Sequence, residues 1–134
     1  MRRLRILLAA AVLAVFVATP ATASPVTAAY PACSVQMFTF GSGFQVFVTI
    51  NNATASALNG WTVRFTLAPA IATSTAFNGI LTRDATGGAI TPMVWNVVIA
   101  AGGQLTTGFS GGGNTPTLVV PTDFALDGRP CTAV

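Results

Sequence analysis

The sequence predicts an all-β protein whose two antiparallel sheets pack as a sandwich, and three observations lead to this prediction. After Cys33 the apolar residues recur with a period of two. Gly, Pro, Asn and Thr interrupt the chain about every eight to twelve residues. No long amphipathic helix pattern is present. This spacing is typical of short strands joined by Greek-key connections. The sequence shows no internal repeat and no sign of a second domain, so residues 33–134 are expected to form one domain.

Two segments show the alternation most clearly. Residues 44–50 place apolar side chains at every even position, and only Phe47 interrupts the polar face between them. Residues 61–67 place apolar side chains at every odd position, beginning with Trp61, and Pro69 ends this run because proline cannot donate to a central ladder. Shorter strands are expected at 80–83, 89–93, 95–99, 104–109 and 124–126.

The first 23 residues have the pattern of a secretory signal peptide. A basic start at residues 2–5 precedes an apolar run at 6–18, which is too short to span a bilayer comfortably. Ala21-Thr22-Ala23 has the small-x-small pattern of a cleavage site, so we expect cleavage after Ala23 and an extracellular protein. Residues 24–32 would then form a short disordered leader. An uncleaved N-terminal membrane anchor is the alternative.

The charge of the mature chain is balanced, because the signal peptide carries half of the basic residues. Three arginines remain against three aspartates, which gives a formal charge of zero. Nucleic acids and acidic membranes need clustered cations, so neither is expected as a partner. A surface built from Thr, Ser, Asn, Gln and Gly suits a neutral ligand rich in hydroxyl groups.

The residues that usually carry catalysis are missing. The chain has no His, Glu or Lys, which excludes Ser-His-Asp and Cys-His catalysis and imidazole metal sites. Asp123 and Asp127 are close enough to suggest a glycosidase pair, but in a turn segment they more often accept loop hydrogen bonds. Calcium would need a denser acidic loop. We therefore expect no enzymatic activity, no cofactor and no metal site.

Two further motifs concern covalent chemistry. Cys33 and Cys131 lie near the two ends of the mature chain, and a lone pair of cysteines in an exported protein is usually a disulfide. We therefore expect a bridge that joins the ends of the domain. Asn52-Ala53-Thr54 fits the pattern of a glycosylation acceptor, which is a short and weak motif.

A series of short fragments carries a likeness to a known family, through their order and spacing. They are Cys33-Ser34-Val35, Gly43-Phe44, Val46 to Asn51, Asn59-Gly60-Trp61-Thr62-Val63, Trp95-Asn96, Ile99 to Gly103, Gly108-Phe109, Leu126-Asp127-Gly128 and Pro130-Cys131. Between Cys33 and Cys131 the chain thereby resembles a family 2 carbohydrate-binding module, a cellulose-binding domain, in a stand-alone secreted copy.

The resemblance implies a sandwich of about nine strands with a flat face that binds cellulose, or a related polymer such as chitin or xylan, through three exposed aromatic residues. The apolar C–H face of a sugar ring stacks on such rings. The three family tryptophans correspond to Phe40, Phe77 and Trp95, with Asn78 and Asn96 as hydrogen-bonding neighbours. Phenylalanine offers a smaller ring and no indole N–H, so the resemblance implies weaker stacking at two of the positions.

The exposure of these rings is a separate prediction. Trp61 is expected in the core. Strict alternation would place Trp95 in the core with Val97 and Ile99, whereas the resemblance exposes it, and we favour exposure. Phe77 is expected to be exposed beside a turn. For Phe40 both exposure and burial stay open.

The expected function is that of a monomeric, secreted, non-catalytic module that binds an insoluble polysaccharide. The alternative is a secreted interaction protein or adhesin that has lost glycan binding and uses its Phe-rich face for a protein partner. Phe38, Phe40, Phe47 and Phe77 would form that face. Three rings in one plane would favour the glycan, and a rounded cluster of rings the protein partner.

Overall fold

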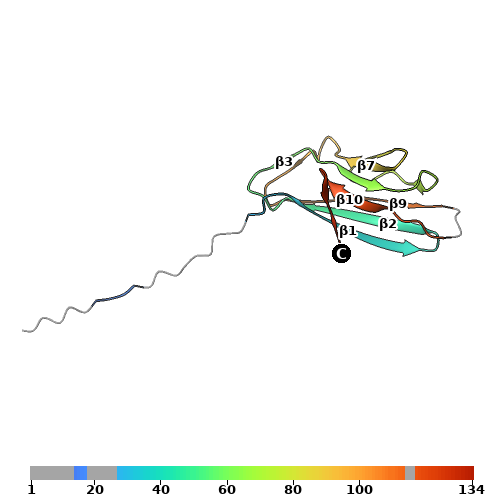
Figure 1. The fold of residues 1–134 in the computed structure, drawn as a ribbon. Helices are drawn as coiled ribbons and strands as arrows, with labels where there is room; N and C mark the ends of the chain where they lie inside the picture. Colours follow the sequence, from blue (N-terminus) through green and yellow to red (C-terminus); the bar gives the residue numbers. More distant parts are fainter. Residues whose placement is uncertain (1–13, 18–26, 114–116) are drawn as a thin grey trace, which may run out of the picture.

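The computed structural model describes residues 14–17, 27–113 and 117–134. The predicted signal peptide, 1–23, and the leader, 24–32, lie outside these ranges except at 14–17 and 27–32. Figure 1 shows the domain as two layers of strands, with β1, β2 and β9 in one layer and β7 in the other. No α-helix occurs among the described residues, and none of their segments forms a helix that could cross a membrane. The predicted all-β sandwich is confirmed.

Two five-stranded sheets and one strand pair make up the domain. The first, named the front sheet, has the order β12 (Thr132–Ala133), β1 (Ala32–Phe40), β2 (Gly43–Asn51), β9 (Gln104–Gly112) and β5 (Ala72–Thr73). The second, named the back sheet, has the order β11 (Arg129–Pro130), β10 (Thr122–Leu126), β4 (Val63–Thr66), β7 (Gly87–Thr91) and β6 (Ile80–Arg83). The pair is β3 (Leu58–Asn59) and β8 (Val98–Ile99).

The predicted strand at 80–83 matches β6, and the other predicted strands are found with shifted bounds. The run at 95–99 shrinks to β8, because residues 94 and 95 form a turn. β1 is a long strand that was not among the predicted runs, since Phe38 and Phe40 on its outer face hide the alternation. The described residues contain twelve strand segments, compared with the nine or so that the resemblance implies. Five of the twelve have only two residues, and the count depends on whether these are counted as separate strands.

Strand register fixes which side chains share a face of the front sheet. β1 and β2 are antiparallel, with Gln36 opposite Phe47 and Phe38 opposite Gln45. β2 and β9 are also antiparallel, with Phe47 opposite Gly108. Because side chains alternate along a strand, even positions of β1 and odd positions of β2 point away from the back sheet.

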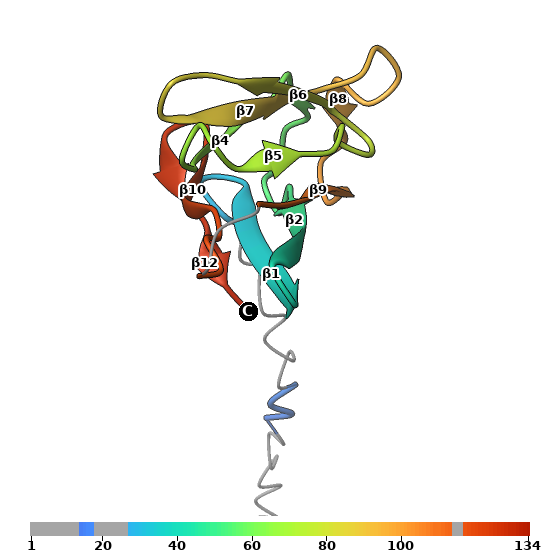
Figure 2. The same cartoon turned by 90° about the vertical axis from the view of Figure 1, so that its right-hand side faces the viewer.

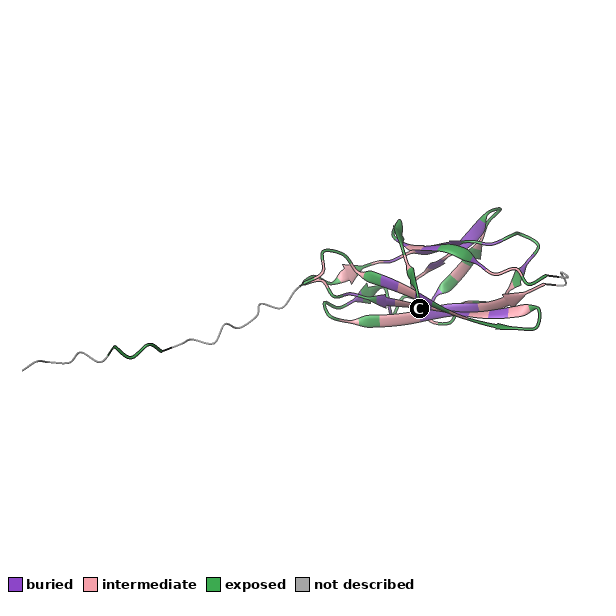
Figure 3. Ribbon diagram, turned by 60° about the horizontal axis from the view of Figure 1, so that its bottom comes forward, coloured by how far each residue is buried: buried purple, intermediate pink, exposed green. Residues whose placement is uncertain are grey.

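The core lies between the sheets and contains a column of aromatic rings. The Phe65 ring of the back sheet stacks on Phe109 of the front sheet and on Phe124, with centroid distances of 4.7 and 5.6 Å. Phe44 meets Phe109 edge to face at 6.0 Å. Such pairs contribute about 0.5–1.5 kcal/mol each beyond their buried area. Figure 3 shows buried residues, in purple, along strands of both layers.

Trp61 belongs to this core, as predicted from its place at the head of an alternating run. Its side chain is 2% exposed, and its indole N–H donates to the carbonyl of Asn96 over 3.0 Å. This hydrogen bond ties the core to the loop between β7 and β8, which carries Trp95.

Asn52, the residue of the glycosylation motif, lies in the interior. Its side chain is fully buried, and its amide nitrogen donates to the carbonyls of Ile99 and Ala100 over 3.0 and 3.1 Å. Its amide oxygen accepts a hydrogen bond of 2.6 Å from the Thr54 hydroxyl. The side chain therefore serves as a tie between the loops that follow β2 and precede β9, and it offers no surface to a glycosylating enzyme.

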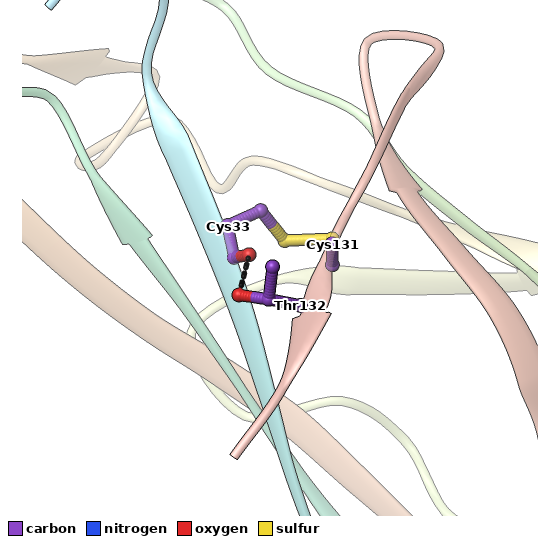
Figure 4. The surroundings of a disulfide bond; sticks show 3 residues. All are labelled: Cys33, Cys131 and Thr132. Carbon is purple, nitrogen blue, oxygen red and sulfur yellow. Dashed lines mark hydrogen bonds between the residues drawn. A yellow bond between two sulfur atoms is a disulfide. The ribbon is translucent and has the colours of Figure 1, made fainter.

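The expected disulfide between Cys33 and Cys131 is present and joins the two ends of the domain. Figure 4 shows it between β1 and the segment that precedes β12, where the Thr132 hydroxyl donates to the Cys33 carbonyl over 3.3 Å. The Cα atoms are 4.6 Å apart and the cysteines are 98 positions apart in sequence. The described part of the leader also contacts the domain, since the Arg129 guanidinium lies 3.2 Å from the centre of the Tyr30 ring.

Removal of this bridge is expected to destabilise the fold without changing it. The double variant Cys33→Ala/Cys131→Ala should lower the free energy of unfolding by about 2–5 kcal/mol, because the bridge closes a long loop and restricts the unfolded chain. Guanidinium denaturation followed by circular dichroism measures this difference. An unchanged denaturation midpoint would contradict a stabilising role for the bridge.

Candidate functional site

The outer surface of the front sheet carries a group of aromatic side chains, here named the aromatic face. Phe40 is 59% exposed, Phe77 is 38% exposed and Trp95 is 69% exposed, and the exposure expected for Phe77 and Trp95 is confirmed. Phe38 is exposed as well, because residues two apart on β1 point to the same side. Phe38 is therefore no buried alternative to Phe40. The face consists of Phe38, Phe40, Phe47 and Phe77 along the sheet and of Trp95 at its end, where Trp95 lines a hollow together with Gln104 of β9.

Three of these rings form a contiguous cluster in the middle of the face. The Phe47 ring lies between Phe38 and Phe77, with centroid distances of 6.0 and 5.7 Å. The ring planes are inclined by 83° and 57° to that of Phe47, so the cluster is a ridge and not a flat platform. Phe47, which interrupts the polar alternation in the sequence, is thus the link between β1 and Phe77.

Phe77 reaches the face because residues 72–78 run along the free edge of β9. The Phe77 amide donates to the Gly108 carbonyl over 3.0 Å, and the Ser74 amide donates to the Ser110 carbonyl over 2.8 Å. The Thr107 hydroxyl donates to the Phe77 carbonyl over 2.8 Å. This edge segment extends the front sheet beyond β9 and positions the Phe77 ring beside that of Phe47.

Gly108 permits this close approach. A Cβ atom at this position would overlap the carbonyl oxygen of Val46 and would lie 2.8 Å from Cε1 of Phe77. A glycine in a strand often marks such a contact with another part of the chain. The position of the Phe77 ring therefore depends on the missing side chain of Gly108.

The two asparagines that were expected beside the rings hold the backbone around them. Asn78 has a φ of 53°, a left-handed conformation that asparagine tolerates, and its amide donates to the Thr106 carbonyl over 2.9 Å. Asn96 is 6% exposed; its side chain accepts from the Met93 amide and donates to the Asn78 carbonyl, each over 2.8 Å. Asn96 thus fixes the turn that exposes Trp95, and ligand contact by Asn78 and by Asn96 stays a prediction.

The aromatic face carries no formal charge in the part of the chain that the structure describes. The polar side chains that surround the rings on this side of the sheet are amides and hydroxyls, such as those of Gln36, Gln45 and Thr49. The charged residues from position 27 onward all belong to the strands and turns of the back sheet: Arg64, Arg83, Asp84, Asp123, Asp127 and Arg129. Contacts at the face must therefore be apolar or made by neutral hydrogen-bonding groups.

The charged groups of the back sheet hold turns. Asp84 accepts hydrogen bonds from the backbone and hydroxyl of Thr86 and from the Gly87 amide, and these lower the pKa of the Asp84 carboxyl. Arg83 donates to the carbonyls of Gly87 and Ile71, each over 2.8 Å. Asp127 accepts from the Thr62 amide over 3.0 Å. Among the described residues, no group of three or more His, Cys, Asp or Glu side chains could hold a metal ion.

Two hollows adjoin the strands. One of about 230 Å³ lies at the Trp95 end of the aromatic face, where the loop between β7 and β8 meets the start of β9. Figure 2 shows this loop projecting from the sandwich near β6 and β8. The other, of about 440 Å³, lies between the sheets on the disulfide side and includes Met37, Phe124 and Cys131 in its lining. Only the first is continuous with the aromatic face.

Comparison with known proteins identifies a family and several relatives. The family model described as "Cellulose binding domain" matches residues 32–131. Exoglucanase A of Cellulomonas fimi is 33% identical over 112 residues, which cover 84% of this chain and 12% of that enzyme. A cellulose/chitin binding protein of Mycobacterium tuberculosis is 33% identical over 95 residues, which cover 70% of this chain and 66% of that protein. The chain spans 11 to 16% of the length of three relatives named as exoglucanases or an endoglucanase.

Solved structures share the fold. The chitin-binding domain of Chi18aC from Streptomyces coelicolor superposes with a TM-score of 0.61 at 24% identity, covering 78% of this chain and 96% of that domain. The chitin-binding domain of a chitinase from Pyrococcus furiosus gives a TM-score of 0.56 at 23% identity, covering 75% and 96%. At this level of identity the likeness supports the sandwich architecture alone.

A methyl group at Gly108 is expected to disturb the edge segment. Gly108→Ala should lower the free energy of unfolding by about 1–3 kcal/mol, the usual cost of overpacking, because the new Cβ would collide with Val46 and the Phe77 ring. Chemical denaturation measures the stability, and the ring resonances of Phe77 report the displacement by NMR. Wild-type stability together with unshifted Phe77 resonances would contradict the close contact.

Proposed function

Because the chain belongs to the cellulose-binding-domain family, we propose that it is a secreted, non-catalytic module that binds an insoluble β-linked polysaccharide through the aromatic face. The observation that carries this proposal is the uncharged front-sheet surface with exposed rings at Phe40, Phe77 and Trp95. These rings come from three separate parts of the chain, and their exposure supports the proposal that all three contact the same ligand.

The dimensions of the face suit an extended polymer. Phe40 is paired with Gly43 at the start of β2. At the other end of β2, Asn51 is paired with Gln104, which lines the hollow at Trp95. Gly43 and Asn51 are eight residues apart along β2, which corresponds to roughly 27 Å at about 3.4 Å per residue. A surface of this length contacts several sugar rings in succession, and the apolar C–H faces of those rings can stack on aromatic side chains.

Absence of catalysis and export to the outside are part of the same proposal. The sequence supplies no His, Glu or Lys, and its three aspartates lie in the back sheet and its turns, away from the aromatic face. The signal-peptide pattern and the disulfide support secretion. Relatives named as an exoglucanase and as a cellulose/chitin binding protein, together with the family description, support cellulose and chitin as the polymers to test.

A protein partner is the second candidate function, and one observation favours it. The inclined rings of Phe38, Phe47 and Phe77 form a ridge that would suit a protein pocket better than a flat crystal surface. Family membership favours the polysaccharide, and so does the placement of Phe40 and Trp95 outside the ridge. The protein partner is therefore not the favoured function.

Depletion of the exported protein from solution by insoluble polymers tests the proposal. On microcrystalline cellulose, chitin or insoluble xylan, the wild type should bind, and Trp95→Ala, Phe77→Ala and Phe40→Ala should each weaken binding by roughly two- to tenfold, since each ring contributes a stacking contact. Tyr30→Ala is the matched control, because Tyr30 is an exposed ring that contacts Arg129 outside the face.

Two results would overturn the proposal. One is that no polymer depletes the wild-type protein. The other is that the three ring variants, with unchanged circular dichroism spectra, bind as well as the wild type.

A further inference from the structure

We propose that the hollow beside Trp95 receives the 2-acetamido group of an N-acetylated sugar, and that the face thereby prefers chitin to cellulose. This inference rests on the proposed polysaccharide binding and assigns its ligand class. The hollow has a volume of about 230 Å³. Its lining consists of Trp95, Asn96, Val98, Ile99, Ala100, Gly103, Gln104 and Leu105.

Ring stacking by itself does not distinguish the two polymers. Both are β-linked chains of pyranose rings, and both present apolar C–H faces to an aromatic surface. They differ in the substituent at carbon 2, a hydroxyl in cellulose and an acetamido group in chitin. A site that discriminates must therefore offer, next to a stacking ring, an apolar wall for the methyl group and a polar group for the amide.

The hollow offers both. Val98, Ile99 and Leu105 supply apolar wall, and Val98 is exposed to solvent at its rim. Gln104 is exposed, and its side-chain amide makes no hydrogen bond within the part of the chain that the structure describes. A glutamine amide can donate to an acetyl carbonyl and accept from an acetamido N–H. Gln104 is thus a free polar group next to an apolar wall.

The wall of the hollow is held in place before any ligand binds. The Ala100 carbonyl accepts from the Gly103 amide over 2.8 Å and from the buried Asn52 side chain over 3.1 Å. A Cβ atom at Gly103 would lie 2.9 Å from that carbonyl, so this turn is packed closely. On the opposite side, Asn96 fixes the turn of Trp95 through the hydrogen bonds described above. A hollow built in this way requires little ordering when it binds.

Size and charge restrict the occupant. The hollow is several times larger than the about 30 Å³ that one water molecule occupies in the liquid, so it accommodates an acetamido group. No charged side chain lines it, and the charged residues from position 27 onward belong to the back sheet. A neutral substituent therefore fits this environment, whereas a carboxylate-bearing sugar would enter without a cation to pair with.

Binding isotherms on insoluble chitin and cellulose test this inference. The wild type should bind chitin more tightly, and Gln104→Ala and Ala100→Leu should each reduce the affinity for chitin roughly fivefold, the value of about one hydrogen bond or one blocked contact. Their affinity for cellulose should stay within about twofold of the wild type. Ala85→Leu adds the same bulk in an exposed turn of the back sheet and serves as the control.

The possible results separate the inference from the proposed function. If both polymers bind equally and the hollow variants leave the ratio of affinities unchanged, the inference is wrong while polysaccharide binding stands. If the wild type binds neither polymer, both fail. A shift of the Gln104 side-chain amide resonance on addition of N-acetylglucosamine oligomers, and none with cello-oligomers, supports the inference in a second measurement that is independent of the variants.

Discussion

The arrangement of the aromatic face depends on the close contact between β9 and the segment 72–78. Because Gly108 has no side chain, Phe77 can pair with it and still lie beside Phe47. The same segment continues to Asn78, whose carbonyl accepts a hydrogen bond from the Asn96 side-chain amide, and Asn96 directly follows the turn that exposes Trp95. A single chain of backbone and amide contacts thus connects a glycine in the sheet with two of the three predicted binding rings. Loss of that contact would disturb both rings together.

From position 27 onward the charged side chains all lie in the back sheet and its turns, and this distribution decides what the front sheet can bind. In the back sheet, Arg83 donates hydrogen bonds to backbone carbonyls, and Asp84 and Asp127 accept them from backbone amides. The front sheet presents rings, amides and hydroxyls. Its interactions therefore depend on contact area and on neutral hydrogen bonds, which salt screens little compared with ion pairs. Selectivity among neutral polymers must then come from shape, which is why the hollow at Trp95 matters.

The sequence allowed the fold class, the disulfide, the buried Trp61 and the exposed Trp95 and Phe77 to be predicted, because period-two patterns, a lone cysteine pair and family motifs are local signals. β1 was missed because apolar residues on both of its faces hide the period. The sequence already shows that Phe47 is unusual, because it lies on an otherwise polar face of its strand. Its contacts with Phe38 and Phe77 depend on the strand register and on the position of the edge segment, which the sequence does not show. The burial of Asn52 and Asn96, the contact at Gly108 and the hollow all depend on tertiary packing, which no short motif encodes.

The measurement that tests the central claim most directly is an NMR titration of the labelled protein with soluble chito- and cello-oligosaccharides, because it locates the binding surface without a mutation. The claim predicts shifts in β1, β2, β9, the Phe77 segment and the Trp95 indole, with the residues of the back sheet unchanged. Shifts concentrated in the back sheet, or in the hollow on the disulfide side, would contradict it, since the aromatic face would then not be the surface that binds sugar.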